Sequence, residues 1–159
     1  MKLFPPGAKP GQINTLVRIL MENEGSISVS RLSKRVHQNI DGLLPVLEAC
    51  TMLGIAAVSD ATVTLTGQGR KLKQSNIDSF IAKGIARIEP FKTAISTLRK
   101  EGELSTMELS ELLKEHGIKM YTDADVNATL LREELLKWMI SYKLMKRNHK
   151  RDSWSVRQA

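Results

Sequence analysis

Cysteine is nearly absent from this sequence, since Cys50 is the single thiol in 159 residues. One thiol excludes a disulfide framework and a cysteine-based zinc site, and it fits a reducing cytoplasm. Long hydrophobic runs are absent too, because no apolar stretch reaches the roughly 18 residues of a membrane helix. The start, Met1 to Gly7, has no long apolar stretch after its lysine, so we expect no secretory signal. These absences predict a cytoplasmic protein that is not embedded in a membrane.

Arrangements typical of catalysis and metal binding are also missing. The three histidines, His37, His116 and His149, are far apart, and none has a cysteine or a paired carboxylate at ligand spacing. The adjacent carboxylates Glu133 and Glu134 would point in different directions on a helix, which does not suit paired acid and base catalysis. No Ser-His-Asp or Cys-His arrangement stands out. We therefore expect no enzyme, no metal site and no cofactor.

The nearest candidate for a phosphate-binding loop is residues 66–71, which read Thr-Gly-Gln-Gly-Arg-Lys. The segment lacks the Walker spacing and has no Ser or Thr after the lysine. We interpret it as the exit from a β-hairpin into a short helix.

Acidic residues are in the minority, with 17 Asp and Glu against 24 Lys and Arg, for a net charge of +7. Neutralisation of phosphates supplies most of the energy of non-specific nucleic-acid binding. The excess makes nucleic acid, or another acidic partner, the first hypothesis to test. Its weight depends on where the positive charge lies.

Periodicity predicts three helices and a hairpin in the first half of the chain. Residues 1–11 hold three of the five prolines and form an extended lead-in. A helix ends at Gly25, a short second helix runs from Ser28 or Ser30 to His37, and a third runs from Asn39 or Asp41 to Gly54. Two β-like runs, 55–58 and 62–65, follow. Expected inward-facing residues of the first and third helices are Ile13, Leu16, Val17, Leu20, Met21, Leu43, Leu44, Leu47, Cys50 and Leu53.

The same order begins again at Ser75, which with Asp78 forms a possible capping box. An apolar helical pattern from Ile81 to Leu98 continues past Pro90, so we expect a kink or two abutting helices there. A second capping box, 105–108, opens a helix that ends at Gly117. Residues 122–125 cap a third helix with Trp138 and Met139 on its apolar face. The runs 144–146 and 153–156 close the chain as a hairpin.

Helix, helix, helix, hairpin therefore occurs twice, which is the order of a winged helix-turn-helix. We expect a mainly α fold with small β-hairpins, built as tandem winged-helix-like halves. The predicted organisation is a lead-in at 1–11, a first half at 12–74 and a longer second half at 75–159.

A winged helix that reads DNA places its third helix in the major groove, where Arg, Lys, Asn and Gln reach base edges. The third helix of the first half contains Asp41 and Glu48 but no Lys or Arg, which is the wrong sign for docking against phosphates. Positive charge lies on the second helix, after the first hairpin and in the last hairpin. That last basic run is also consistent with an ordinary solvent-facing turn. Candidate nucleic-acid-binding residues are Arg31, Lys34, Arg35, Arg70, Lys71, Lys146, Arg147, Lys150 and Arg151.

Two stretches carry a family resemblance. Residues 39–56 read Asn-Ile-Asp-Gly-Leu-Leu-Pro-Val-Leu-Glu-Ala-Cys-Thr-Met-Leu-Gly-Ile-Ala, and residues 63–70 read Val-Thr-Leu-Thr-Gly-Gln-Gly-Arg. They resemble the AAA-associated C-terminal domain, which follows the ATPase domain in some nitrate/sulfonate/bicarbonate-type ABC transporter ATP-binding proteins. That family's pattern is Ile-Asp-x-Leu-Leu-Pro-x-x-Glu-Ala-x-x-x-Leu-Gly, then Leu-Thr-x-x-Gly-Arg. The resemblance implies a cytoplasmic, winged-helix-like accessory domain that regulates or contacts a transporter ATPase, with ATP bound by another polypeptide.

Two functions from different classes remain. The preferred one is a non-enzymatic regulatory or protein-interaction module whose partner is a transporter ATPase subunit or another protein. The alternative is a winged-helix transcriptional regulator that binds double-stranded DNA, for which a homodimer is a natural form. A third hypothesis, a small-molecule sensor, has no polar constellation to support it.

Overall fold

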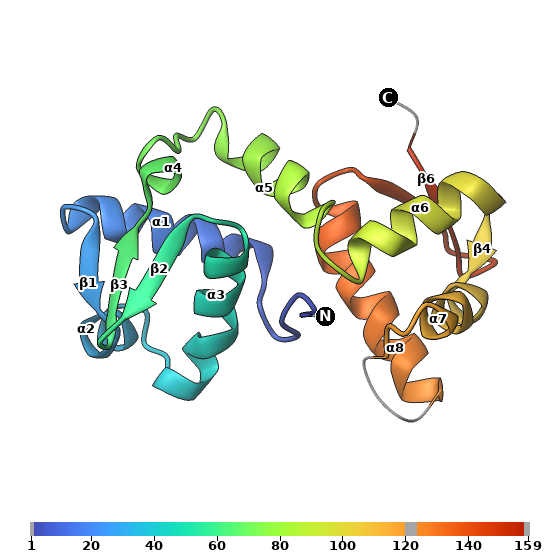
Figure 1. The fold of residues 1–159 in the computed structure, drawn as a ribbon, viewed down its shortest axis with the longest axis horizontal. Helices are drawn as coiled ribbons and strands as arrows, with labels where there is room; N and C mark the ends of the chain where they lie inside the picture. Colours follow the sequence, from blue (N-terminus) through green and yellow to red (C-terminus); the bar gives the residue numbers. More distant parts are fainter. Residues whose placement is uncertain (1, 120–123, 158–159) are drawn as a thin grey trace. The chain divides into compact units, whose positions relative to one another are not determined.

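The computed structural model describes residues 2–119 and 124–157, and the chain divides into two compact units. Phe4–Ile81 form one unit, which we call the N-terminal unit. Ala82–Ala159 together with Met1–Leu3 form the other, the C-terminal unit. Both contain helices and a small sheet (Figure 1). In the described part of the chain, no helix is long and apolar enough to cross a membrane.

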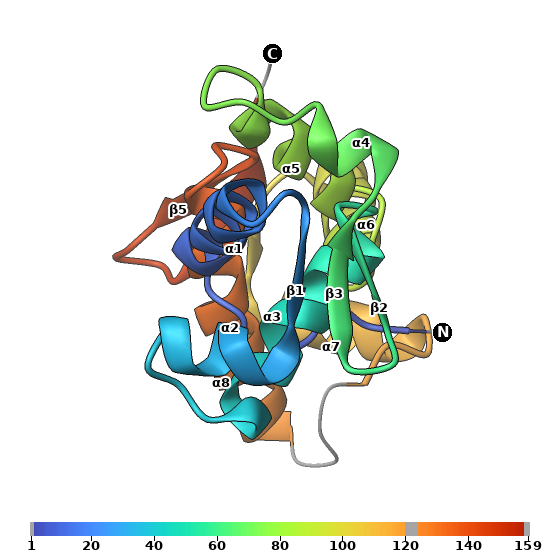
Figure 2. The same cartoon turned by 90° about the vertical axis from the view of Figure 1, so that its left-hand side faces the viewer.

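The N-terminal unit consists of short helices around a three-stranded antiparallel sheet. Its strands lie side by side in the order β1-β3-β2 (Figure 2). In the register of this sheet, Val63 of β3 pairs with Ile27 on one side and with Val58 on the other. The elements are α1 (Pro10–Glu22), β1 (Ser26–Ser28), α2 (Val29–Arg35), α3 (Ile40–Met52), β2 (Ala56–Ser59), β3 (Thr62–Leu65) and α4 (Gly67–Arg70).

Side-chain caps fix where these helices begin. The Ser28 hydroxyl accepts a hydrogen bond from the Arg31 N–H at 3.1 Å, and Asn39 Oδ1 accepts one from the Gly42 N–H at 2.7 Å. Both caps satisfy donors that a helix start leaves unpaired, as the sequence predicts. Asp60 and Ala61 form the two-residue turn between β2 and β3, each with a positive φ, a conformation that matches the twist of the paired strands.

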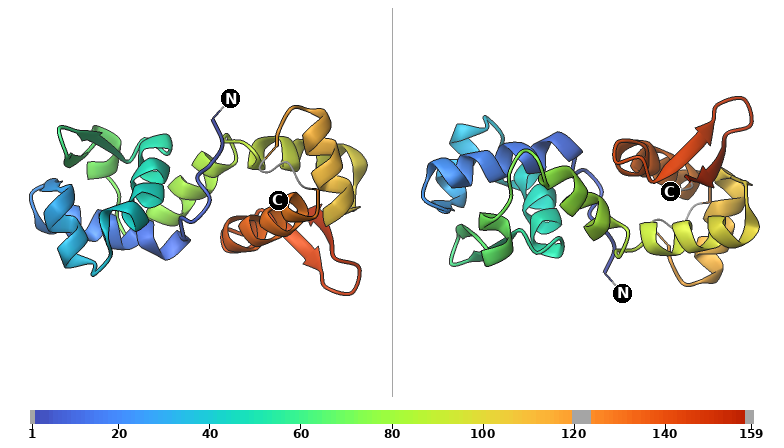
Figure 3. Two further views of the ribbon diagram at one scale, coloured as in Figure 1. Left: turned by 90° about the horizontal axis from the view of Figure 1, so that it is seen from below. Right: turned by 90° about the horizontal axis from the view of Figure 1, so that it is seen from above.

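The C-terminal unit repeats this order on a larger scale. Its sheet has the order β4-β6-β5, and the β5–β6 hairpin stands out from the helices of the unit in both views of Figure 3. The expected capping box is confirmed, because Ser105 and Glu108 exchange side-chain to backbone hydrogen bonds of 3.1 Å. The elements are α5 (Ile77–Ile85), which begins in the preceding unit, α6 (Phe91–Glu101), β4 (Leu104–Ser105), α7 (Thr106–Glu115), α8 (Ala124–Glu134), the π-helix η1 (Leu135–Ile140), β5 (Met145–Asn148) and β6 (Ser153–Val156).

The fold class, mainly α with small β-hairpins, is confirmed, and several details differ from the prediction. Of the two arrangements expected around Pro90, two abutting helices are confirmed, because α5 ends at Ile85 and α6 begins at Phe91. The expected capping box at Ser75 is wrong, because α5 begins at Ile77 and Asn76 is the residue before it. The predicted cap at 122–125 falls largely on residues outside the described part. The sequence predicts one continuous third helix here and does not predict that its last part, η1 after α8, is a π-helix.

Two residues expected on the apolar face of a helix are exposed. Leu44 on α3 is 53% exposed and Met21 on α1 is 40% exposed. On α3 the inward positions are instead filled by Val46 and Ala49, beside Leu43, Leu47 and Cys50. The apolar residues of α3 cover a wider arc of the helix than the side that packs on the core. The apolar pattern alone therefore could not show that Leu44 lies outside the core.

Candidate functional site

The outward side of α3 is the first candidate, since a winged helix that reads DNA would present this helix. Ile40, Leu44 and Glu48 are spaced four residues apart and Thr51 follows three later, so they share one side of the helix. Ile40 is 46% exposed, Leu44 is 53% exposed and Thr51 is also exposed, while Glu48 is half-buried. We call these four residues the α3 face. Ile40 and Leu44 thus place two large exposed apolar side chains one helical turn apart on this side of the helix.

The electrostatics of the α3 face differ from those of a phosphate-binding surface. No Lys or Arg occurs between positions 36 and 69, a range that contains α3 and the whole β2–β3 hairpin. Asp41 in the first turn of α3 is exposed. Val58 on β2 adds a third exposed apolar side chain, at 44%. Helix α3 and the β2–β3 hairpin therefore offer apolar, neutral polar and acidic groups but no Lys or Arg.

The predicted cations of the N-terminal unit lie at the edges of this region. Arg31 and Lys34 are exposed on α2. Arg35 is engaged, because its Nη2 lies 2.6 Å from Glu22 Oε2. Arg70 lies against Gly25, at which an added Cβ would be 2.6 Å from Arg70 Nη1. Lys71 follows Arg70 and is exposed.

A polar cluster holds the β5–β6 hairpin of the C-terminal unit, and Asp152 is its centre. Arg132 donates to both Asp152 carboxylate oxygens, with contacts of 2.6 to 3.1 Å, and Arg147 Nη2 donates at 3.0 Å. The Thr106 hydroxyl donates to Asp152 at 3.0 Å and accepts a 2.8 Å hydrogen bond from the indole N–H of Trp154. These hydrogen bonds, those from Arg132 foremost, lower the pKa of the Asp152 carboxyl to about 2.

Of the four cations predicted in this hairpin, one belongs to the Asp152 cluster and three do not. Arg147 is held by two contacts: it pairs with Asp152, and its guanidinium lies 5.5 Å from the centroid of the Trp154 ring. Lys146, Lys150 and Arg151 are exposed, and within residues 2–119 and 124–157 they form no ion pair. Asn148 Oδ1 accepts hydrogen bonds from the backbone N–H groups of Lys150 and Arg151, which shapes the turn. Three exposed cations thus lie at or beside the turn.

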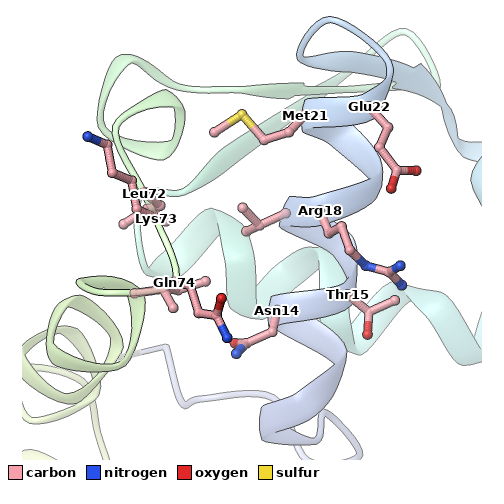
Figure 4. Close-up of a pocket in the computed structure, with 10 residues that line it drawn as sticks. Asn14, Thr15, Arg18, Met21, Glu22, Leu72, Lys73 and Gln74 are labelled. Atoms are coloured by element: carbon pink, nitrogen blue, oxygen red, sulfur yellow. The ribbon is translucent and has the colours of Figure 1, made fainter.

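A groove of about 680 Å³ lies in the N-terminal unit between α1 and the segment after α4. Asn14 and Gln74 approach one another across it, and Met21 extends from α1 above them (Figure 4). Arg18 and Lys73 are its cations, and Val17 and Ile77 are among its apolar lining. The lining mixes polar, charged and apolar side chains, and no three His, Cys, Asp or Glu among the described residues gather to hold a metal ion.

Sequence reasoning missed two of these features. The exposure of Ile40 and Leu44 depends on which side of α3 the core covers, which the apolar pattern does not show. The Asp152 cluster joins Asp152 to Arg132, which is 20 positions before it in the chain, and to Thr106, which is 46 positions before it. A signal was present in Asp152 itself, the one acidic residue within the last basic run.

Comparison with known proteins gives one match. A family model, the C-terminal AAA-associated domain, matches residues 30–148, about three quarters of the chain, from α2 through β5. No curated protein and no solved structure matches the chain. The resemblance found in residues 39–70 is confirmed, and the chain belongs to the family of C-terminal AAA-associated domains.

Proposed function

We propose that the chain is a non-enzymatic accessory module of the cytoplasm that binds and regulates a protein partner, the ATP-binding subunit of an ABC transporter. Membership of the AAA-associated family supports association with an ATPase. The absence of a catalytic constellation in the sequence supports a binding role, and the single thiol fits a reducing compartment.

We interpret both units as winged helices. Each has a helix, a short strand, two helices and a hairpin, and in each the short strand pairs with the last strand of the hairpin. In this interpretation α3 occupies the position of the recognition helix in the N-terminal unit. The composition of that helix then decides which class of partner the unit can bind.

The observation that supports a protein partner is the α3 face. Burying Ile40 and Leu44 against another protein removes apolar surface from water, which is favourable by roughly 25 cal/mol for each Å². Docking the same helix against DNA would place Asp41 near phosphates without any cation on α3 or the β2–β3 hairpin to compensate. The surface is therefore suited to a protein and unsuited to a nucleic acid.

The test is binding of the purified chain to the transporter ATP-binding subunit encoded nearest to it in its genome. We expect Leu44→Glu to weaken this binding by about tenfold or more, because the new charge would be desolvated in the interface. Met107→Glu is the matched control, since Met107 is also an exposed apolar residue, at 43%, but lies on α7 of the other unit. Equal binding by all three proteins, or recovery of nucleic acid alone in native pull-downs, would rule the proposal out.

DNA binding is the second candidate, and the exposed cations of the second hairpin favour it. Lys146, Lys150 and Arg151 could follow a phosphate backbone, and a homodimer would double the contacts. If so, affinity for duplex DNA falls steeply with salt, and the double variant Lys150→Ala/Arg151→Ala lowers the slope of that dependence by about 2. The charge-matched control Lys83→Ala/Arg87→Ala should leave the slope unchanged. Absence of binding at low salt would remove this candidate.

A further inference from the structure

A second groove, of about 470 Å³, lies wholly within the C-terminal unit. It is bounded by α6, by the turn between η1 and β5, and by the end of β6. Four of its nine lining residues are cations and none is acidic. We call it the basic groove. Its cations are Lys92, Arg99, Lys143 and Arg157.

Backbone geometry brings these cations to one place. Lys92 and Arg99 are seven residues apart on α6, so they lie two turns from each other on the same side of the helix. Lys143 has a φ of 59°, and its N–H donates to the Ile140 carbonyl at 3.0 Å. The Arg157 N–H donates to the carbonyl of Leu144 at 3.4 Å. The clustering thus follows from helix periodicity, a tight turn and strand pairing.

These four cations have no counter-ion among the described residues. Within residues 2–119 and 124–157 none of them forms an ion pair. Three carboxylates of the unit are engaged elsewhere: Glu89 accepts hydrogen bonds from the N–H and hydroxyl of Thr93, Glu134 pairs with Lys137, and Asp152 pairs with two arginines. Like charges gathered without compensation repel, so a bound anion would relieve that repulsion.

The rest of the lining is apolar except for Ser96. Ala86, Ile95, Leu144 and Val156 supply the apolar surface, and Ser96 adds a hydroxyl on α6 between Lys92 and Arg99. The volume lies inside the roughly 300–1,000 Å³ range of small-molecule sites. An inorganic ion would leave the apolar wall uncovered. The lining therefore fits a small molecule with an anionic end and a flat or apolar end.

We propose that the basic groove binds a nucleoside polyphosphate. The phosphates lie among Lys92, Arg99, Lys143 and Arg157, and the base lies on the apolar wall formed by Ile95, Leu144 and Val156. A triphosphate carries about four negative charges at neutral pH, which matches the four cations. This site is separate in residues and in unit from the α3 face, so it stands or falls independently of the protein partner.

Isothermal titration calorimetry of the full chain with ATP at low salt tests the proposal. Pyrophosphate and adenosine are the partial ligands: we expect ATP to bind more tightly than pyrophosphate, and adenosine to show no measurable binding. We expect Arg99→Ala to weaken ATP binding by about tenfold or more. The control is Lys100→Ala, the next residue on α6, which is exposed but does not line the groove. Arg157→Ala, on the opposite side of the groove, should weaken binding as Arg99→Ala does.

Several outcomes would overturn the proposal. No heat of binding at about 1 mM ATP would exclude a site of useful affinity. Pyrophosphate binding as tightly as ATP would show an anion site without a place for the base. An equal loss in Lys100→Ala and Arg99→Ala would show general electrostatic attraction rather than a groove, and competition of ATP by a DNA duplex at equal phosphate concentration would point to the same conclusion. Melting temperatures of the variants confirm that each is folded.

Discussion

Gly69 shows at the scale of one residue why the Leu-Thr-x-x-Gly-Arg stretch has glycine at this place. A Cβ at Gly69 would lie 2.1 Å from the carbonyl oxygen of Ile55, which is far inside contact distance. That carbonyl is itself fixed, because it accepts hydrogen bonds from the N–H and the hydroxyl of Thr66 at 3.0 and 3.1 Å. Thr66 in turn caps α4 by accepting from the Gly69 N–H at 3.0 Å. The glycine therefore permits close packing of α4 on the chain before β2.

Replacing Gly69 by alanine should destabilise the N-terminal unit by about 2 kcal/mol or more, because backbone atoms must move to admit the methyl group. Gly67→Ala in the same short helix is the control, since nothing lies within 4 Å of a Cβ there. We expect that change to alter the free energy of unfolding by less than about 1 kcal/mol. Urea denaturation of both variants measures the difference. Equal stabilities would contradict the close packing.

At the scale of elements, the β5–β6 hairpin is fastened to α7 and α8 by the Asp152 cluster. Asp152 follows the turn with a positive φ, its backbone carbonyl accepts from the Thr106 N–H at 2.9 Å, and its carboxylate holds Arg132. The pKa of the carboxyl is lowered in the folded protein. Its contribution to stability is therefore full above the unfolded pKa near 3.9 and is lost as the pH falls towards about 2.

Asp152→Asn should remove this contribution. We expect the variant to lose about 1 kcal/mol of stability at neutral pH, a modest figure because the Asp152 side chain is 35% exposed and solvent screens the pair. Between pH 4 and pH 2 its stability should fall less steeply than that of the unchanged protein. Asp60→Asn is the control, since Asp60 also has a positive φ in a hairpin turn but forms no ion pair among the described residues. Parallel pH profiles of the unchanged protein and Asp152→Asn would refute the role of the cluster.

Elements of different kinds were predictable to different degrees. Helices with a cap and a periodic apolar face, such as α2 after Ser28 and α7 after Ser105, follow from local rules. The strands β1 and β4 do not, because runs of three and two residues carry no alternation to detect and exist only through pairing with β3 and β6. The same limit applies to the sites. A basic run is visible in sequence, whereas the basic groove combines residues as far apart as Lys92 and Arg157.

At the scale of the whole molecule, the two units carry different spectroscopic probes. The single cysteine, Cys50, is buried in the N-terminal unit, and that burial raises the pKa of its thiol to about 12. Both tryptophans, Trp138 and Trp154, are buried in the C-terminal unit. Thiol labelling therefore follows one core and intrinsic fluorescence follows the other.

We expect the two probes to respond separately to mutation, because each unit has its own core. Gly69→Ala should speed thiol labelling of Cys50 in native buffer by about thirtyfold or more, in line with the expected loss of about 2 kcal/mol, and leave the fluorescence transition in place. Asp152→Asn should do the reverse. If both variants shifted both probes equally, the chain would unfold as one cooperative body.

The junction between strand and helix has a mechanical consequence. Ser28 ends β1 and caps α2, and Ser105 ends β4 and caps α7, so one residue serves both elements and no linker separates them. The hairpin of each unit pairs with that short strand, β1 or β4, so a displacement of the hairpin would also move the first residue of α2 or α7. A molecule that binds the hairpin of either unit would therefore act through the paired strand on the first turn of α2 or α7.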